Sequence, residues 1–378
     1  MQLASNSITP KLADNSVVCL MAPTASGKTA LAYELYDTGR YELISVDSAL
    51  IYRDMNIGTA KPTTTELARY PHHLVNIIDP MQSYSVAEFV SDVARLIDSC
   101  HNNGKIPLLV GGTMMYYMAL LDGLSPVPDS EDSIRVRVEQ WRQAEGIQAL
   151  FDYLGKVDPS SHQRLHATDT QRITRAIEVY LQTDIAISDW QRKPKKALAN
   201  NPHQQWHALT VMPDRSWLHK RIEQRLDIMW REGLVAEVVG LLETYPLTPN
   251  MPSMRCVGYR QVLEYLTHIN HRVFEQPHLN KRQFEDVFGK FENPSKQNVG
   301  QDKALQSQSS TLASQTEALA CYQMQNKALY ATRQLAKRQY TWLRKLAQLS
   351  NIDKDLHNNN EIAISSYKSI AQAGEYLR

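Results

Sequence analysis

A short run of small, cationic and hydroxyl residues near the N-terminus has the spacing of a phosphate-binding loop. Gly27-Lys28-Thr29 lies between an apolar run, Val17–Met21, and a helical pattern, Thr29–Tyr36. A helix that begins at such a junction presents backbone N–H groups to an anion. Lys28 adds a positive charge, and the Thr29 hydroxyl is of the type that holds Mg²⁺. The sequence therefore predicts a phosphate or diphosphate site over Ala22, Pro23, Thr24, Ala25, Ser26, Gly27, Lys28 and Thr29.

The loop departs from the motif G-x-x-x-x-G-K-[ST] at one position, because Ala22 stands where the first glycine is expected. Alanine costs little there if its φ angle is negative. The alternative interpretation is a glycine turn in an ordinary strand–helix unit, which the position of the G-K-T run disfavours. The loop alone does not name the ligand.

A carboxylate follows the second apolar run, Tyr41–Val46, which reads as a strand that delivers Asp47 and Ser48 to its carboxyl end. Ligands of open α/β sheets bind at that edge. An aspartate after a strand can also cap a helix or support a metal ion. Because Asp47 would lie beside the phosphate loop, we take it as a candidate catalytic residue.

The third apolar run, Ile106–Val110, ends in Gly111-Gly112-Thr113. A hydrolytic P-loop enzyme usually has an acidic residue there to organise Mg²⁺ and water. The glycines allow a ligand to approach closely, and Thr113 offers a hydroxyl group. The Met- and Tyr-rich run 114–118 that follows packs in the core or lines an apolar pocket.

These elements indicate an α/β protein with a P-loop NTPase-like core, in which helices flank a parallel sheet, and an inserted all-helical domain. The Gln/Ser-rich stretch 294–315 has few aromatic residues, which is typical of disorder. The predicted segments are 1–124 (core, first part), 125–204 (helical insert), 205–273 (core, second part), 274–322 (polar insertion, expected to be disordered), 323–350 (C-terminal core helix) and 351–378 (tail without a clear role).

Composition restricts the class of protein. A formal net charge of +1 over 378 residues means that a nucleic-acid partner would have to be bound by local basic patches. Four cysteines without a C-x-x-C pair indicate a reduced, cytoplasmic protein and argue against zinc. We interpret His72-His73 as structural, because no other ligand stands near them in the sequence. There is no signal peptide and no apolar run of about 18 residues, so we expect no membrane association.

Seven stretches together resemble the tRNA dimethylallyltransferases, which are isopentenyltransferases that modify the adenosine next to the anticodon. They occur in the order of the family and cover most of residues 15–270 and 325–350. The stretches are PTASGKTALA, ELISVDSALIYRDMNIGTAKPT, PHHLVNIIDP, GKIPLLVGGTMMYY, DTQRITRAIEVY, RCVGYRQ and ATRQLAKRQYTWLR.

The resemblance implies transfer of a dimethylallyl group from dimethylallyl diphosphate to N6 of that adenosine, in tRNAs that read codons beginning with U. It implies that Asp47 is the general base, that Thr113 contacts substrate, and that Lys28 stabilises the leaving diphosphate. Thr29 would hold Mg²⁺, the expected cofactor. The expected partners are the anticodon stem-loop of tRNA and the allylic diphosphate, for a chain that acts as a monomer.

The same resemblance implies which residues contact tRNA. Without the resemblance, a single arginine is more often a solvated surface charge. The basic helix expected over 331–348 has two interpretations, a face that binds phosphates or a solvated surface. The implied contacts are Asp47, Ser48, Ala49, Leu50, Thr113, Arg135, Gln171, Arg172, Ile173, Thr174, Arg175, Arg255, Cys256, Val257, Gly258, Tyr259 and Arg260.

Two other functions fit parts of the sequence. A small-molecule or nucleotide kinase would share the ATP-binding type of loop and could use Arg172 and Arg175 in a lid, but it does not predict Gly111-Gly112-Thr113 or the run 255–260. A non-catalytic RNA-binding protein would tolerate loss of Asp47, which is present.

The insertion 274–322 is longer than the usual connector of the family, and the sequence does not decide whether it touches RNA.

Overall fold

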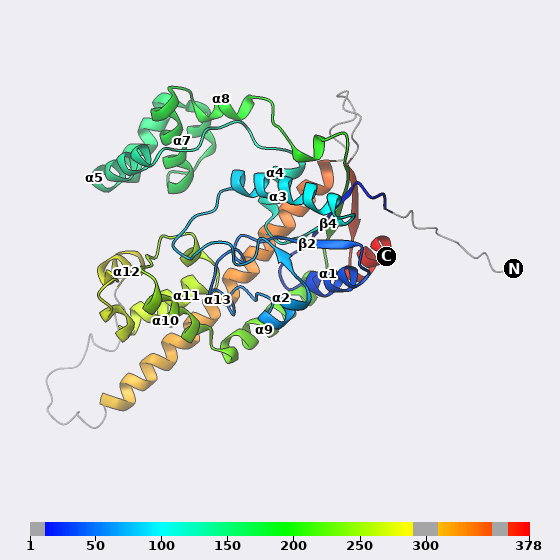
Figure 1. Cartoon of the computed structure of the whole chain (residues 1–378). Helices are drawn as coiled ribbons and strands as arrows, with labels where there is room; N and C mark the ends of the chain where they lie inside the picture. Colours follow the sequence, from blue (N-terminus) through cyan, green and yellow to red (C-terminus); the bar gives the residue numbers. More distant parts are fainter. Residues whose placement is uncertain (1–11, 290–308, 350–361) are drawn as a thin grey trace. The chain divides into compact units, whose positions relative to one another are not determined.

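The computed structural model describes residues 12–289, 309–349 and 362–378 (Figure 1). These residues form two compact units. One unit comprises Met1–Tyr117 with Pro202–Arg378, and the other comprises Met118–Asn201. The larger unit contains the sheet, and the smaller one is helical apart from a single β-bridge.

The sheet of the larger unit has six strands in the order β3-β2-β4-β1-β5-β6, and all the pairings between them are parallel. The apolar runs expected to be strands form β1, β2 and β4, which are almost entirely buried. The predicted α/β class with a parallel sheet is confirmed. The strands are β1 (Ser16–Met21), β2 (Tyr41–Val46), β3 (His72–His73), β4 (Ile106–Gly111), β5 (Gln205–Val211) and β6 (Ala363–Tyr367).

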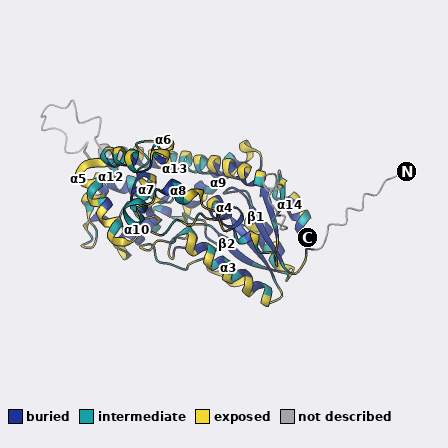
Figure 2. Ribbon diagram, turned by 90° about the horizontal axis from the view of Figure 1, so that it is seen from above, coloured by how far each residue is buried: buried dark blue, intermediate teal, exposed yellow. Residues whose placement is uncertain are grey.

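Helices flank this sheet (Figure 1), and their sequences explain where they begin and which face is buried. Helix α3 starts at a capping box of Ser85 and Glu88, and it buries Phe89, Val93 and Ile97 at helical spacing. Its outer side is exposed (Figure 2). The helices of this unit are α1 (Lys28–Asp37), α2 (Thr64–Arg69), α3 (Val86–Asn102), α9 (Arg215–Glu232), α10 (Leu234–Thr244), η2 (Ser253–Arg255), α11 (Tyr259–His268), η3 (Arg272–Glu275), α12 (Lys281–Phe288), α13 (Ser309–Gln348) and α14 (Ile370–Leu377); α4 (Met114–Leu121) begins in it.

The smaller unit has a hydrophobic core of its own, centred on residues such as Val138, Leu154 and Ile177. Leu124 and Lys196 form an antiparallel β-bridge, so the chain enters and leaves this unit at neighbouring points. The corresponding prediction was a helical insert over 125–204. The helices of the unit are α5 (Asp132–Val157), α6 (Pro159–Arg164), α7 (Thr170–Thr183), α8 (Ile187–Arg192) and η1 (Leu198–Asn200).

The C-terminal part of the chain differs from the sequence prediction in two places. Residues 274–288 were assigned to a disordered insertion, but they complete η3 and form α12, and the buried rings of Phe274 and Phe284 pack 4.8 Å apart. The polar composition that suggested disorder begins only after these aromatic residues. Residues 290–308 lie outside the described part, and α13 already begins at Ser309.

The tail 351–378 was given no role, yet its described residues complete the core. Strand β6 pairs with β5, and α14 packs against α1 with Ala373 fully buried. The hydroxyl of Tyr41 on β2 donates to the carbonyl of Leu377 at 2.8 Å. Strand β6 is only partly buried and half polar, so its sequence gave no clear strand signal. No helix in the described ranges is long and apolar enough to cross a membrane.

Candidate active site

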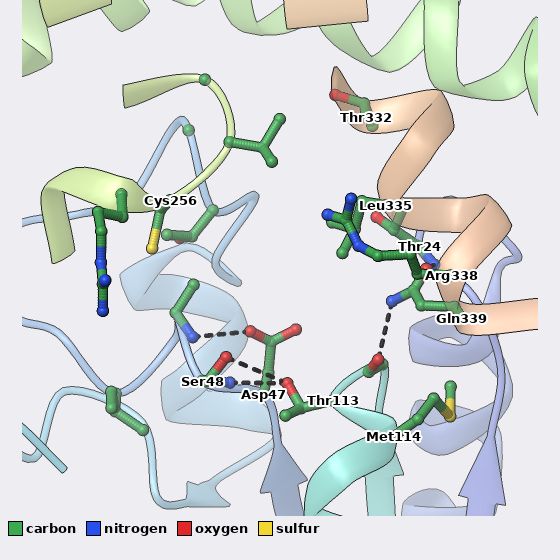
Figure 3. Close-up of a pocket in the computed structure, with 18 of the residues that line it drawn as sticks. Thr24, Asp47, Ser48, Thr113, Met114, Cys256, Thr332, Leu335, Arg338 and Gln339 are labelled. Carbon is green, nitrogen blue, oxygen red and sulfur yellow. Dashed lines mark hydrogen bonds between the residues drawn. The ribbon is translucent and has the colours of Figure 1, made fainter. Parts of the chain in front are cut away.

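A cavity of about 600 Å³ opens at the carboxyl ends of β1, β2 and β4 in the larger unit. Its walls come from the loop before α1, the residues after β2 and β4, helices α9 and α13, and the segment before α11 (Figure 3). The parallel sheet therefore gathers residues that are far apart in the sequence, as expected for a ligand site of an open α/β sheet.

The predicted phosphate loop has the backbone of an anion site. Gly27, the N-cap of α1, has φ +92°, and Ala25 has φ +61°. Left-handed residues in such a turn direct successive N–H groups to one side. Ala22 does not have a positive φ, so the missing first glycine imposes no strain at that position.

Lys28 is a half-buried cation beside this loop. Its ammonium donates to the carbonyl of Pro23 at 3.4 Å. Burial lowers the pKa of Lys28 to about 8, Asp47 opposes that shift, and Arg225 adds to it. The side chain is therefore poised to gain stabilisation from an anionic ligand.

Asp47 is fixed at the end of β2 by its neighbours (Figure 3). Its Oδ1 accepts from the backbone N–H of Ala49 at 2.9 Å. The N–H of Ser48 donates to Thr113 Oγ1 at 3.0 Å, and the Thr113 hydroxyl donates to Ser48 Oγ at 3.3 Å. A Cβ at Gly111 would lie 1.9 Å from the Val46 carbonyl, so the glycine allows β2 and β4 to bring Asp47 and Thr113 together.

Helix α13 forms a wall through Gln339, which the sequence prediction missed. Its buried amide accepts from the N–H of Thr24 at 3.1 Å and donates to the carbonyl of Gly112 at 2.8 Å. The two bonds connect the phosphate loop to the turn after β4. Gln339 lies in the stretch ATRQLAKRQYTWLR, which resembles the family. A neutral polar residue in this largely basic and apolar helix was the available signal that Gln339 has a role.

Arg225 on α9 is a second missed residue. Its guanidinium donates to Thr24 Oγ1 at 3.4 Å and to the carbonyl of Thr59 at 3.3 Å. Burial lowers the pKa of Arg225, and Asp47 opposes the shift. Arg225 lies on the same face of α9 as the buried Leu218 and Ile222. A cation on the apolar face of a helix is unusual, and this was the available signal that Arg225 contributes to a ligand site.

The loop that carries Gly58 and Thr59 into the cavity is held by Glu237 on α10. Glu237 Oε2 accepts from the N–H groups of Asn56 at 2.9 Å and Ile57 at 2.6 Å. Glu237 Oε1 accepts from the N–H of Gly58 at 3.1 Å and from the Tyr259 hydroxyl at 2.5 Å. One carboxylate therefore fixes this loop against the start of α11.

The cavity brings together only some of the predicted site residues. Tyr259 is fully buried and bonded to Glu237, and Arg260 donates to the carbonyl of Pro249, so both support the wall from behind. Thr29 is exposed on the first turn of α1. The predicted residues that line the cavity are Thr24, Ala25, Lys28, Asp47, Ser48, Ala49, Thr113, Arg255, Cys256, Val257 and Gly258, whereas Ala22, Pro23, Ser26, Gly27, Thr29, Leu50, Tyr259 and Arg260 do not.

The remaining predicted contacts lie in the smaller unit. Arg135, Gln171 and Arg172 are exposed there, and Thr174 is half-buried. The structure does not support side-chain contact with RNA for Ile173, which is fully buried in the core of that unit. Arg175 is partly buried and donates to the Ser130 hydroxyl and the Pro128 carbonyl, so it holds the entry to α5.

The chain is similar to proteins of one family over its whole length. It is 78% identical to a tRNA dimethylallyltransferase of Psychrobacter cryohalolentis, with 100% of this chain and 98% of the relative covered. It is 44% identical to one of Acinetobacter baumannii, with 96% and 97% covered.

Solved structures agree with this similarity. The tRNA isopentenylpyrophosphate transferase of Bacillus halodurans is 26% identical, with a TM-score of 0.53, and the match covers 96% of this chain and 93% of that one. A eukaryotic dimethylallyltransferase acting on tRNA, at 21% identity and a TM-score of 0.62, shares the fold over 95% of this chain and 75% of that one. The family model described as IPP transferase matches residues 50–346, and the chain belongs to that family.

Proposed function

We propose that this chain transfers a dimethylallyl group from dimethylallyl diphosphate to N6 of the adenosine next to the anticodon in tRNA. Full-length similarity to tRNA dimethylallyltransferases, at 78% and 70% identity, supports the proposal. The structural observation that carries it is a single cavity in which the phosphate loop meets Asp47 and Thr113.

Residues on one side of the cavity suit the leaving diphosphate. Two cations reach the phosphate loop there: the Lys28 ammonium donates to the Pro23 carbonyl, and the Arg225 guanidinium donates to Thr24 Oγ1. As the bond between carbon and the diphosphate oxygen breaks, negative charge grows on that oxygen. Fixed donors that are already oriented stabilise such charge without rearrangement.

Thr29, one residue beyond Lys28 at the start of α1, is the proposed Mg²⁺ ligand; it is exposed and lies outside the lining of the cavity. A magnesium ion in proteins takes few protein ligands and completes its shell with water and phosphate oxygens. A magnesium ion bound there would neutralise part of the negative charge on the diphosphate.

Asp47 is the proposed general base. The N6 amine of adenine is a weak nucleophile, because its lone pair is delocalised into the ring. As the new N–C bond forms, the amine must lose one proton, and the Asp47 carboxylate accepts it. The bonds from Ser48 to Thr113 and from Ala49 to Asp47 hold this carboxylate at the floor of the cavity.

The rest of the cavity suits an allyl group and a base. Apolar side chains in its lining can enclose five carbons and exclude water; these include Met114, Tyr116, Ile222, Leu226 and Leu335. The exposed groups Arg255, Arg338 and Trp342 offer phosphate contacts and a ring for stacking. A base in a loop is displaced from its neighbours at a cost of a few kcal/mol, which such contacts offset.

The kinase alternative is less well supported. Of the two arginines that a kinase lid could use, Arg175 is bonded to Ser130 and Pro128, and Arg172 pairs with Asp169. Gly111-Gly112-Thr113 after β4 also supplies no carboxylate to organise Mg²⁺ and water.

The experiment that tests the proposal combines protein, Mg²⁺, unmodified tRNA and dimethylallyl diphosphate. The RNA is then digested to nucleosides and analysed by mass spectrometry. We expect N6-(dimethylallyl)adenosine and an equal amount of diphosphate. Unmodified RNA, together with phosphate transfer from ATP to a small acceptor, would support the kinase instead.

A further inference from the structure

A second cluster of reactive side chains lies away from the cavity, toward the amino-terminal end of β2. It consists of Glu42 on β2, His73 on β3 and Cys100 near the end of α3. None of the three lines the cavity. The expectation that no other ligand lies near the histidine pair is wrong for His73, because the fold brings it two ligands that are distant in the sequence.

The three side chains converge on one point. His73 Nε2 lies 3.2 Å from Glu42 Oε2, and Cys100 Sγ lies 3.4 Å from the same oxygen. All three ligand atoms lie within 4.8 Å of one another. Zinc bonds of about 2.0–2.3 Å in a tetrahedron place ligand atoms roughly 3.3–3.7 Å apart, so small side-chain movements would satisfy this geometry.

The environment also matches a metal site. Cys100 is fully buried, whereas the side chains of Glu42 and His73 are 22% and 41% exposed. One side is therefore closed by protein and the other is accessible to a water molecule. Asn103 donates to Glu42 Oε1 at 3.3 Å and so orients the carboxylate, as outer-shell partners of metal ligands do.

We propose that Glu42, His73 and Cys100 form a zinc site, with water as the fourth ligand. Zinc suits a mixed set of thiolate, imidazole and carboxylate ligands. On binding, the Cys100 thiol loses its proton to solvent, and the lone pair of His73 Nε2 coordinates the metal while its proton is carried by Nδ1. No oxidant or reductant is needed.

A metal ion at this site would cross-link three elements, β2, β3 and α3. Strand β3 has only two residues and pairs with β2 through Leu43 and Ile44. It ends the long connection that begins at Asp47 and carries Gly58 and Thr59 to the cavity. A metal bound to β2, β3 and α3 together would fix the end of that connection, so we expect metal binding to raise the thermal stability of the protein.

The test uses the untagged full chain, freed of metal with a chelator and then titrated with Co²⁺ and Zn²⁺. We expect one Co²⁺ per chain, an absorption band from thiolate-to-cobalt charge transfer, its loss on adding Zn²⁺, and a rise in Tm with Zn²⁺. His73→Gln and Cys100→Ala should remove the band, and Asn103→Ala should weaken Zn²⁺ binding by about 10–100-fold.

Matched controls separate this site from adventitious binding. His72→Gln and Cys321→Ser change the same residue types outside the cluster and should bind Co²⁺ as the unaltered chain does. His73 is partly exposed, so His73→Gln keeps the fold even if Cys100→Ala does not. Absence of the band, or a band that persists in His73→Gln, would overturn the proposal.

Discussion

At the scale of single residues, the cavity holds two half-buried cations, Lys28 and Arg225, whose charges Asp47 only partly balances. Burial lowers the pKa values of both Lys28 and Arg225, and Asp47 only partly compensates. A diphosphate between them would favour their charged forms. On the proposed function, the two cations would both attract the anionic donor and stabilise the diphosphate as it leaves.

The affinity for dimethylallyl diphosphate should depend on pH through Lys28. Its pKa is about 8 in the free protein and rises when the anion binds. Below pH 8 the ammonium is already charged and adds no pH dependence of its own; above pH 8 binding must take up a proton, and affinity falls by up to about tenfold per pH unit. Titration with an unreactive thiolo analogue of the donor measures this.

Lys28→Arg is the control for that titration, because arginine stays charged throughout the range. Its affinity should lack the decline above pH 8. Equal affinity at pH 7 and pH 10 in the unaltered chain would exclude Lys28 as the titrating group.

At the scale of elements, helix α13 completes the site by inserting Gln339 between the loops that follow β1 and β4. Helix α10 performs a similar task for the loop at Gly58 through Glu237. Both helices support the site with buried polar groups, whose removal leaves backbone donors or acceptors unpaired.

Gln339→Leu should lower the free energy of unfolding by about 1–3 kcal/mol, because the Thr24 N–H and the Gly112 carbonyl lose their partner. It should weaken binding of the allylic diphosphate more than binding of tRNA. Gln334→Leu, at an exposed position of the same helix, is the control. Urea unfolding with equal stability for the two variants would show that the bridge contributes nothing.

Glu237→Gln should also cost about 1–3 kcal/mol, because an amide nitrogen would face backbone N–H groups that now donate to a carboxylate oxygen. We expect a loss of turnover as the loop at Gly58 and Thr59 moves. Glu243→Gln, exposed on the same helix, should behave like the unaltered chain. If both variants melt at the same temperature, Glu237 does not hold the loop.

The sequence predicted the elements whose signal is local. Strands β1, β2 and β4 are largely apolar runs, and the turns after them, which carry Lys28, Asp47 and Thr113, indicated the edge at which the cavity opens. Strand β6 was missed because its pairing partner β5 is far away in the sequence, and α12 because the polar stretch after it was extended back over Phe274 and Phe284. Gln339, Arg225 and Glu237 were missed for the same reason, since each acts on backbone groups far away in the chain.

At the scale of the whole molecule, the smaller unit can be altered separately from the unit that contains the cavity. The smaller unit has its own core, and Leu124 bridges to Lys196 while Asp122 pairs with Lys195 at 2.5 Å. Its ends are therefore close enough for a short linker to replace what lies between them.

Replacement of residues 125–195 by a short Gly/Ser linker should leave the larger unit folded and able to bind dimethylallyl diphosphate. Because the exposed Arg135 and Arg172 are lost, tRNA affinity should fall and its dependence on salt should become weaker. Filter binding at several salt concentrations measures both. An unchanged salt slope would exclude this unit from the RNA-binding surface.

The most direct test of the account is single-turnover transfer by Asp47→Asn. The amide oxygen can still accept the bond from Ala49, so the loop keeps its geometry while the base is lost. With saturating tRNA and labelled dimethylallyl diphosphate, we expect tRNA affinity within about twofold of the unaltered chain and transfer slower by about 10²–10⁴-fold. Transfer at the original rate, or loss of tRNA binding with unchanged chemistry, would contradict the role of Asp47 as the base.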